Sequence, residues 1–557
     1  MLTVESPAVS QNCSAANDAL SQTMAWARRH LTERGLIVAL IAAHLAIVLP
    51  LMIWLGVGID DSFTLETTRH GLGPAIQRGM WFELQPPFYF AVLSLWRQVF
   101  GDSMLAARLF SVVCSTLFLI VLAGVSRRFV PQIRAPWLIA VVALHPFVIW
   151  AAVEIRLYAL MLLVSALQLR TFHDGFLAGS DAAPSDGIHP RCRSRVWSLV
   201  LATIGLYTHY YSGFLLVAHA GVLIVLRRWR SLRVYLVAMV IVGACFAPLV
   251  FVIPRQFSEH TRGIAETTLL DCVKVVGWQV QYELLPVSRQ MTSGQQFWSK
   301  WIWRALILAC PLLLLPKIRE RLWQRHNVTV LILAAGLALL FVLLVQMVGS
   351  GMFEFRHGLM LFVPMLLASF AVAGAIAGNR GVGWWSCLML CFGAAAVIND
   401  YRLFAKNGDW IRVADYLQTH ERRGEPVVVF LPTSGLALSQ HYTGANELVV
   451  VPRKEECLTF DVREYVLDGP AAIETPLQEI APTADVVWLV TSGAKHYMGI
   501  DLGWPVLEDW VRERFIVLDE VRFHGSTVRR LRRKRDELAN RPSDVRVFLE
   551  RTDELED

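Results

Sequence analysis

Charged residues are scarce in this chain of 557 residues. Asp, Glu, Lys and Arg together make up 18% of it, whereas hydrophobic residues make up 55%. A soluble globular protein carries roughly a quarter charged residues. The apolar residues also gather in runs of about 17–25 residues, the length that crosses a hydrocarbon core about 30 Å thick. The composition therefore excludes an ordinary soluble protein and predicts a polytopic α-helical membrane protein.

Signals of several other protein classes are also absent. The first apolar run is too long for a signal-peptide core and lacks a small-residue cleavage site, so we expect it to remain as a signal anchor. The nine cysteines show no metal-type spacing. The sequence leaves open whether Cys272 and Cys457, both expected on the outer side, form a disulfide. There is no phosphate-cradling glycine loop and no basic surface laced with aromatic residues, so we expect no nucleic-acid partner.

We interpret about eleven apolar segments as transmembrane spans: 36–57, 104–125, 136–152, 157–170, 197–211, 212–226, 233–254, 300–316, 327–348, 357–378 and 383–399. Short loops rich in Lys and Arg stay in the cytoplasm. When residues 1–35 are placed inside, the basic loops after the second, fourth, sixth and eighth spans all fall on the cytoplasmic side. Residues 84–100 contain Pro86, Pro87 and Arg97, so we expect a re-entrant or surface helix there.

The same topology places the polar, chemically capable segments on the outer side. These are the first loop 58–103, the segments 154–158, 208–211 and 354–357, and a large loop at 255–299 that we expect to act as a lid. Ionisable groups at membrane depth are costly, so they usually pair with one another or mark a site. The one-sided distribution therefore predicts a functional site at the outer face.

The C-terminal part has a different pattern, because the long apolar runs stop at about residue 399. Asp409 is expected to cap a helix that carries Trp410, Val413, Ala414 and Leu417 on one face. A short buried-type strand is predicted at 426–431, and further strands are predicted at 486–490 and 515–518. We therefore expect a transmembrane domain at 36–399, a small soluble α/β domain at 400–530 on the outer face, and a charged tail at 531–557.

The first outer loop contains the most informative residues. A single Arg156 or His209 at a span end is usually a snorkelling anchor or a local ion pair, and interfacial tyrosines are common. The adjacent acids Asp60 and Asp61 have no obvious anchoring role directly after a span. The Pro86-Pro87 pair further along the loop shapes the backbone, since each proline fixes φ and lacks an N–H.

Together these motifs resemble the glycosyltransferase C-type (GT-C) superfamily. The likeness is greatest to its family-39-like bacterial members, which are related to protein O-mannosyltransferases and lipid A aminoarabinose transferases. It rests on the acidic pair, the Pro-Pro-aromatic segment and the short motifs at 100–103, 108–111, 154–158, 208–210, 356 and 409–410. It covers most of the chain. One departure is Gln85, which stands where related proteins often have His before the Pro-Pro pair.

The resemblance implies the GT-C fold and a bacterial inner-membrane location, with the C-terminal domain in the periplasm. It implies transfer of a sugar from a polyprenyl-phosphate-linked donor to a hydroxyl of a lipid, polysaccharide or protein, at the outer face and with inversion. Neither the sugar nor the acceptor is specified by the residues. Some members use a divalent metal and others do not. Beyond Asp60 and Asp61 we find no clear ligand set, so we expect none to be required.

The resemblance also assigns roles to residues. Asp60 matches the base that takes the proton of the acceptor hydroxyl, with Asp61 next in line. Arg356 and Arg156 are expected to bind the donor phosphate, because a guanidinium fork matches phosphate oxygens. Glu154 is expected to orient Arg156 or a sugar hydroxyl. The expected substrate pocket consists of Glu154, Tyr158, His209, Tyr210, Gln85 and His357.

Two other functions are compatible with parts of this pattern. A transporter or flippase for a lipid or solute predicts ionisable residues near span midpoints and an inverted repeat. The spans are mostly clean and the polar face is one-sided, which favours an enzyme. A ligase that moves a finished glycan from its lipid carrier needs the same base and phosphate-binding groups, so the sequence hardly separates it from a single-sugar transferase.

Overall fold

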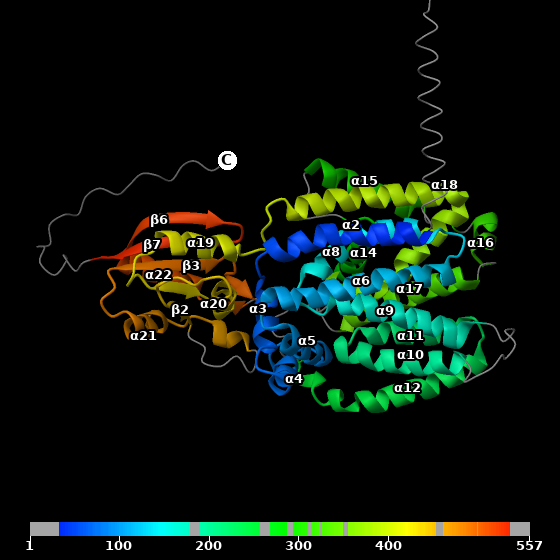
Figure 1. Ribbon diagram of the computed structural model, residues 1–557, viewed down its shortest axis with the longest axis horizontal. Coiled ribbons are helices and arrows are strands. Elements are labelled where there is room, and N and C mark those ends of the chain that lie inside the picture. The colour runs from blue at the N-terminus through cyan, green and yellow to red at the C-terminus, as the bar shows by residue number, and fades with distance from the viewer. Residues whose placement is uncertain are drawn as a thin grey trace, which may run out of the picture.

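The computed structural model contains a helical bundle and an α/β domain that lies at one end of it (Figure 1). It describes residues 33–178, 190–256, 268–286, 293–309, 311, 313, 315–323, 326–348, 355–452, 461–497 and 500–534. The bundle helices are α2 (Glu33–Trp54), α6 (Met104–Phe129), α7 (Ala135–Ala143), α8 (Pro146–Val153), α9 (Tyr158–Phe172), α10 (Pro190–Thr208), α11 (Ser212–Val225), α12 (Trp229–Val250), α14 (Leu269–Leu284), α15 (Ser293–Ala309), α16 (Pro316–Trp323), α17 (His326–Val348) and α18 (Leu359–Tyr401).

The expected spans coincide with these helices, but their number is confirmed only in part. Among the described residues, five helices are long and apolar enough to cross a membrane: α2, α6, α12, α17 and α18. A sixth span results if α7 and α8, which meet at a bend of 58°, are counted together. The bend falls at Pro146, which cannot donate a backbone hydrogen bond within a continuous helix. Helices α9 and α11 are shorter, with 15 and 14 residues.

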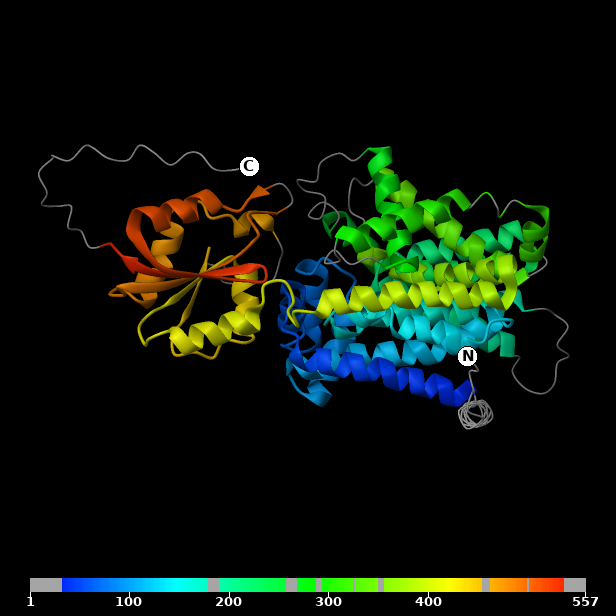
Figure 2. The ribbon, with the colours of Figure 1, turned by 90° about the horizontal axis from the view of Figure 1, so that it is seen from above.

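Helix α18 contains the last two expected spans. Its 43 residues are interrupted at Ala377 and Gly378, where the backbone leaves helical geometry. Gly378 has a φ of +58°, which a residue without a Cβ adopts at little cost. The second half then runs the length of the bundle toward the α/β domain (Figure 2).

Three short helices cover the end of the bundle that faces the α/β domain (Figure 1): α3 (Ile59–Thr67), α4 (Leu72–Trp81) and α5 (Phe88–Phe100). Helix α5 follows the Pro-Pro pair and has only 13 residues. Its Tyr89, Phe90 and Leu93 are buried, whereas Leu95 and Val99 are exposed. The segment 84–100 is therefore a short amphipathic helix at the end of the bundle, as expected for a surface helix.

The basic loops and the acidic first loop lie at opposite ends of the bundle. At one end, Arg127 pairs with Glu33 at 3.0 Å, and the carbonyl of Arg128 accepts from Asn327 at 2.7 Å. Helix α16, which carries further basic residues, lies at this same end (Figure 1). Helices α3, α4 and α5 lie at the other. This separation matches the charge asymmetry on which the expected orientation is based.

The C-terminal domain has a five-stranded sheet of order β2-β1-β3-β7-β6. Strand β1 (Val427–Phe430) is parallel to β2 (Leu448–Val451) and β3 (Val486–Ser492), whereas β7 (Ser526–Arg533) is antiparallel to β3 and to β6 (Phe515–Phe523). Strands β4 (His496–Tyr497) and β5 (Ile500–Asp501) form a separate pair. The remaining helices of the domain are α19 (Trp410–His420), α20 (Pro432–Ser439), α21 (Ala471–Ile480) and α22 (Trp504–Arg514).

Alternate residues of β1 belong to two hydrophobic cores. Val428 and Phe430 pack in a core with residues of α21 and α22, and Val427 and Val429 pack in another with residues of α19 and α20. A strand buried on both faces reads as a continuous apolar run, which explains why β1 and β3 were predictable from the sequence. Strands β2 and β7 were not predicted.

Two expectations about this domain need correction. Asp409 stands at the N-cap position of α19, but its carboxylate makes no capping bond and instead accepts from Arg412 Nε at 3.0 Å. The expected tail 531–557 begins too early, because 531–533 belong to β7, where Leu531 is fully buried. The rest of that tail from 535 onward lies outside the described residues, as does Cys457.

Candidate functional site

Asp60 and Arg356 meet at the α3 end of the bundle although they are 296 residues apart in the sequence. Asp60 lies in the first turn of α3, and Arg356 lies in the short 3-10 helix Phe355–Gly358 that precedes α18. Arg356 Nη1 donates to Asp60 Oδ2 at 2.6 Å. The two side chains are 28% and 41% exposed, Arg356 being the more buried. The pair therefore combines a cation and a carboxylate that a substrate can reach.

The environment of Asp60 keeps it ionised. Burial raises the pKa of this carboxyl, but the nearby charges of Arg156 and Arg356 outweigh that effect, so the pKa lies below its usual range. While it is paired with Arg356, Asp60 is thus a weak base.

Arg156 belongs to the same group of charges but is held by a residue that the sequence did not single out. Its Nη1 donates to Glu83 Oε2 at 2.6 Å and to Thr64 Oγ1 at 3.1 Å. Both side chains of the Arg156–Glu83 pair are more than nine-tenths buried. Burial raises the pKa of Glu83, and the attraction of Arg156 only partly offsets this. Tyr158 lies within electrostatic reach of Arg156, and its ring stacks on Trp150.

Asp61 is fully buried, in contrast to its neighbour. Its Oδ1 accepts from the backbone N of Ile155 at 2.8 Å, and its Oδ2 accepts from the backbone N of Gly58 at 3.0 Å and from Lys406. Arg108 lies 3.8 Å from Oδ2. These cations lower the pKa of Asp61 despite its burial. The geometry does not support the expected catalytic role of Asp61, because its oxygens are enclosed by protein donors; it anchors the start of α3.

We expect Asp61→Asn to lower the free energy of unfolding by roughly 3–5 kcal/mol, because removal of one partner leaves buried cations without compensation. Asp60→Asn removes only a partly exposed pair, so its effect on stability should be below about 1 kcal/mol. Thermal unfolding of both variants in lipid particles tests the difference. Equal unfolding temperatures for the two variants would contradict the assignment of Asp61 as the anchor.

Glu154 is oriented away from its expected partner. Its Oε1 lies 2.9 Å from Lys406 Nζ, the same ammonium group that binds Asp61. Burial and the neighbouring Asp61 carboxylate raise the pKa of Glu154 to about 7. Among its described contacts there is none with Arg156, whose carboxylate partner is Glu83. Glu83, and not Glu154 as expected, is therefore the carboxylate that orients Arg156.

Other expected pocket residues have contacts elsewhere. Tyr210 donates to Gln256 Oε1 at 2.7 Å, and Gln256 in turn donates to the carbonyl of Met80 at the end of α4. His209 lies in the turn between α10 and α11, where its Nδ1 accepts from the backbone N of Tyr211 at 3.3 Å. The structure therefore places His209 and Tyr210 at the same end of the bundle as Asp60.

Gln85, His357 and the expected lid are the remaining parts of the predicted site. Gln85 lies directly before the Pro-Pro pair, and its Oε1 is buried without a hydrogen-bond partner. His357 lies in the 3-10 helix beside Arg356, and its side chain is outside what the structure describes. The expected lid 255–299 contains α14, with its segments 257–267 and 287–292 also outside the described residues.

Three charged residues of this site were missed by the sequence analysis: Glu83, Arg108 and Lys406. Glu83 stands two residues before the noted Gln85, and Lys406 stands three before the noted Asp409. Arg108 belongs to a motif that carried the resemblance, but no role was given to it. Its guanidinium donates to the carbonyls of Met52, Leu55 and Gly56 and so caps the end of α2. A charged side chain next to an apolar run was the available signal in each case.

No set of three His, Cys, Asp or Glu residues within the described ranges is arranged to hold a metal ion. The site is instead composed of acidic and basic side chains in contact: Asp60, Asp61, Glu83 and Glu154 with Arg108, Arg156, Arg356 and Lys406. Such an arrangement can take a proton at the accessible carboxylate and bind an anion at the guanidinium groups.

Comparisons with known proteins find likeness only among solved structures. No family model and no curated protein matches the chain. The apo structure of ArnT from Cupriavidus metallidurans superposes with a TM-score of 0.52 at 15% identity, covering 89% of this chain and 98% of ArnT. The structure of the same protein bound to undecaprenyl phosphate gives 0.51 at 14% identity, with the same coverage. A weaker likeness, with a TM-score of 0.40, is to the oligosaccharyltransferase AglB from Archaeoglobus fulgidus.

ArnT is a lipid A aminoarabinose transferase of the GT-C superfamily. The superposition extends over nearly the whole of both chains, so it includes the bundle and the C-terminal domain. At this level of identity the likeness concerns the fold. The chain therefore has the fold of ArnT, in agreement with the resemblance that the sequence motifs show.

Proposed function

We propose that this protein is a membrane glycosyltransferase that moves a sugar from a polyprenyl-phosphate-linked donor to an acceptor hydroxyl. The observation that carries the proposal is the Asp60–Arg356 pair, an accessible carboxylate 2.6 Å from a guanidinium at the end of a GT-C bundle. The reaction needs these two groups: a base for the acceptor proton and a cation for the departing phosphate.

In this proposal the donor phosphate competes with Asp60 for Arg356. The donor phosphate offers Arg356 a second anion with matching geometry. When the phosphate takes that partner, Asp60 loses a neighbouring compensating charge and its pKa rises, which makes it a better base. Donor binding thus prepares Asp60 for the acceptor.

The transfer itself is a single displacement. The acceptor oxygen forms a bond to the anomeric carbon as its proton passes to Asp60, and the bond between that carbon and the phosphate oxygen breaks on the opposite face. Polyprenyl phosphate leaves without a proton because Arg356 stabilises its charge. A single attack from the opposite face inverts the anomeric carbon.

Arg156 adds a second positive charge that is already compensated by Glu83. Its charge contributes to the lowered pKa of Asp60, so it lies within electrostatic reach of the reacting groups. In the proposed site it contributes to the positive potential for the donor phosphate, with Glu83 and Thr64 holding its position.

We further propose that transfer takes place at the outer face of a bacterial inner membrane. The basic loops lie at the opposite end of the bundle from Asp60, and such loops stay in the cytoplasm. A donor held in the outer leaflet would then meet its acceptor beside the C-terminal domain.

The proposal is tested by native mass spectrometry of the protein in native lipid particles, with undecaprenyl phosphate added as the probe. We expect a bound polyprenyl phosphate, and a glycosylated carrier in particles from the natural host would give the mass of the sugar. The ArnT structure with undecaprenyl phosphate motivates this choice of probe. No binding, even with the probe in excess, would contradict the proposed donor class.

A further inference from the structure

The segment that connects the bundle to the C-terminal domain passes directly beside α3. It runs from the end of α18 at Tyr401 to the start of α19 at Trp410. Midway, Lys406 reaches into the bundle, where its Nζ binds Asp61 and lies 2.9 Å from Glu154 Oε1. The side chain of Lys406 is only 12% exposed. Lys406, a residue of the connecting segment, therefore belongs to the network of charged side chains next to the candidate base Asp60.

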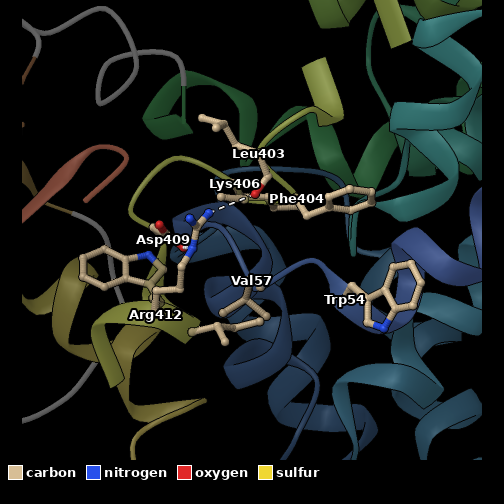
Figure 3. Close-up of a pocket in the computed structure, with 11 residues that line it drawn as sticks. Trp54, Val57, Leu403, Phe404, Lys406, Asp409 and Arg412 are labelled. Atoms are coloured by element: carbon tan, nitrogen blue, oxygen red, sulfur yellow. Dashed lines mark hydrogen bonds and ion pairs between the residues drawn. The ribbon is translucent and has the colours of Figure 1, made fainter. Parts of the chain in front are cut away.

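The connecting segment is fixed on both sides of Lys406. Phe404 packs edge-on against Trp54 of α2, with ring centroids 5.8 Å apart. Arg412 donates to the carbonyl of Leu403 at 2.9 Å and to Asp409, and so closes the segment into a loop (Figure 3). A small cavity of about 160 Å³ lies between this loop and the end of α2.

The domain makes a second contact with the same region. The backbone N of Val57, just before α3, donates to Nε2 of His441 at 3.2 Å. His441 follows α20, and α20 packs against α3. The domain therefore contacts α3 through α20 as well as through the connecting segment.

Lys406 balances charges that the bundle alone leaves uneven. Asp61 and Glu154 are two adjoining carboxylates, and the bundle supplies one cation, Arg108, at 3.8 Å from Asp61. Tyr401, at the end of α18, and Arg108 also lie within electrostatic reach of Glu154. Without Lys406, repulsion between the carboxylates would act on the start of α3 and on the turn that carries Arg156. Two like charges in one buried site cannot both stay ionised without strain.

We propose that Lys406 is a positioning residue through which the C-terminal domain sets the geometry of the active site. By neutralising Asp61 and Glu154 it fixes the start of α3, which carries Asp60, against the 154–156 turn, which carries Arg156. The domain is then a required part of the catalytic end. The catalytic consequence rests on the proposed function, whereas the structural consequence does not.

The test uses the full-length protein in lipid particles with Lys406→Met and the double variant Lys406→Met with Glu154→Gln. We expect Lys406→Met to lower kcat by at least about tenfold with little change in the Kd for undecaprenyl phosphate. The loss should be larger at pH 8.5 than at pH 6, because at low pH the carboxylate pair holds a proton and needs the cation less. Removal of the Glu154 charge should restore most of the activity. Lys495→Met, on the α/β domain, serves as the control.

A second measurement does not depend on catalysis. When folding raises the pKa of a carboxyl group, the folded protein loses stability as the pH rises through the folded-state pKa of that group. In Lys406→Met the pKa of Glu154 should rise further. The unfolding temperature of this variant should therefore fall below that of the wild type between pH 7 and 8.5. In the double variant the unfolding temperature should recover. A wild-type kcat in Lys406→Met, or a loss that is independent of pH and not rescued by Glu154→Gln, would overturn the proposal. If the wild type shows no transfer, the unfolding series alone decides the positioning role.

Discussion

Asp60→Asn should reduce sugar transfer by roughly 10²–10⁴-fold, the contribution typical of a positioned general base. Asparagine has nearly the same shape and can still accept a hydrogen bond, but it cannot take the acceptor's proton. Transfer is measured as the appearance of glycosylated acceptor and the release of polyprenyl phosphate in lipid particles. The loss should appear in kcat.

Donor binding should survive this substitution. In the wild type Asp60 Oδ2 lies 2.6 Å from Arg356 Nη1. The Asp60 carboxylate therefore competes with the donor phosphate for the same guanidinium. Asp60→Asn should therefore bind undecaprenyl phosphate as tightly as the wild type or more tightly. Glu66→Gln is a matched control, because Glu66 is an acid on the same helix and its ion pair is with the exposed His70. Full activity in Asp60→Asn would remove this residue as the base.

Arg356→Ala should raise the Kd for undecaprenyl phosphate about 10–150-fold, which corresponds to roughly 1.5–3 kcal/mol for hydrogen bonds to a charged group. Arg356→Lys keeps the charge but not the fork, so it should recover only part of the affinity. Arg522→Ala is a suitable control, because Arg522 is an 81% exposed arginine on the surface of the α/β domain. An unchanged affinity in Arg356→Ala would refute the phosphate-binding role.

The same variant should change the pH dependence of the reaction. Arg356 and Arg156 hold the pKa of Asp60 below its usual range in spite of its partial burial. Removal of Arg356 should raise that pKa, so the carboxylate becomes protonated at a higher pH. The acid limb of the kcat/KM profile should therefore move to higher pH in Arg356→Ala. A limb that stays in place would indicate that another group titrates in this range.

Much of the architecture follows from local sequence patterns. The apolar runs predict where the bundle helices lie, because the length of such a run is fixed by the thickness of the membrane. The continuous apolar runs at 427–430 and 486–490 predict strands that are buried on both faces. The Pro86-Pro87 pair predicts a helix start, since proline fits the first turn of a helix but not its interior. These features depend on residues that are close together in the sequence, so they can be predicted from the sequence alone.

The sequence by itself determined that this is a membrane protein with an α/β domain and an acidic pair near a cluster of basic residues, and its motifs pointed to the GT-C fold. Only the tertiary structure decided which acid is accessible. Adjacent residues of an α-helix point about 100° apart, so Asp60 faces Arg356 while Asp61 is enclosed, and the rotation of α3 depends on what packs around it. The partnerships of Arg156 with Glu83 and of Asp61 with Lys406 join segments 73 and 345 residues apart. Such pairs are selected by burial and charge balance in the folded chain, and no spacing in the sequence encodes them.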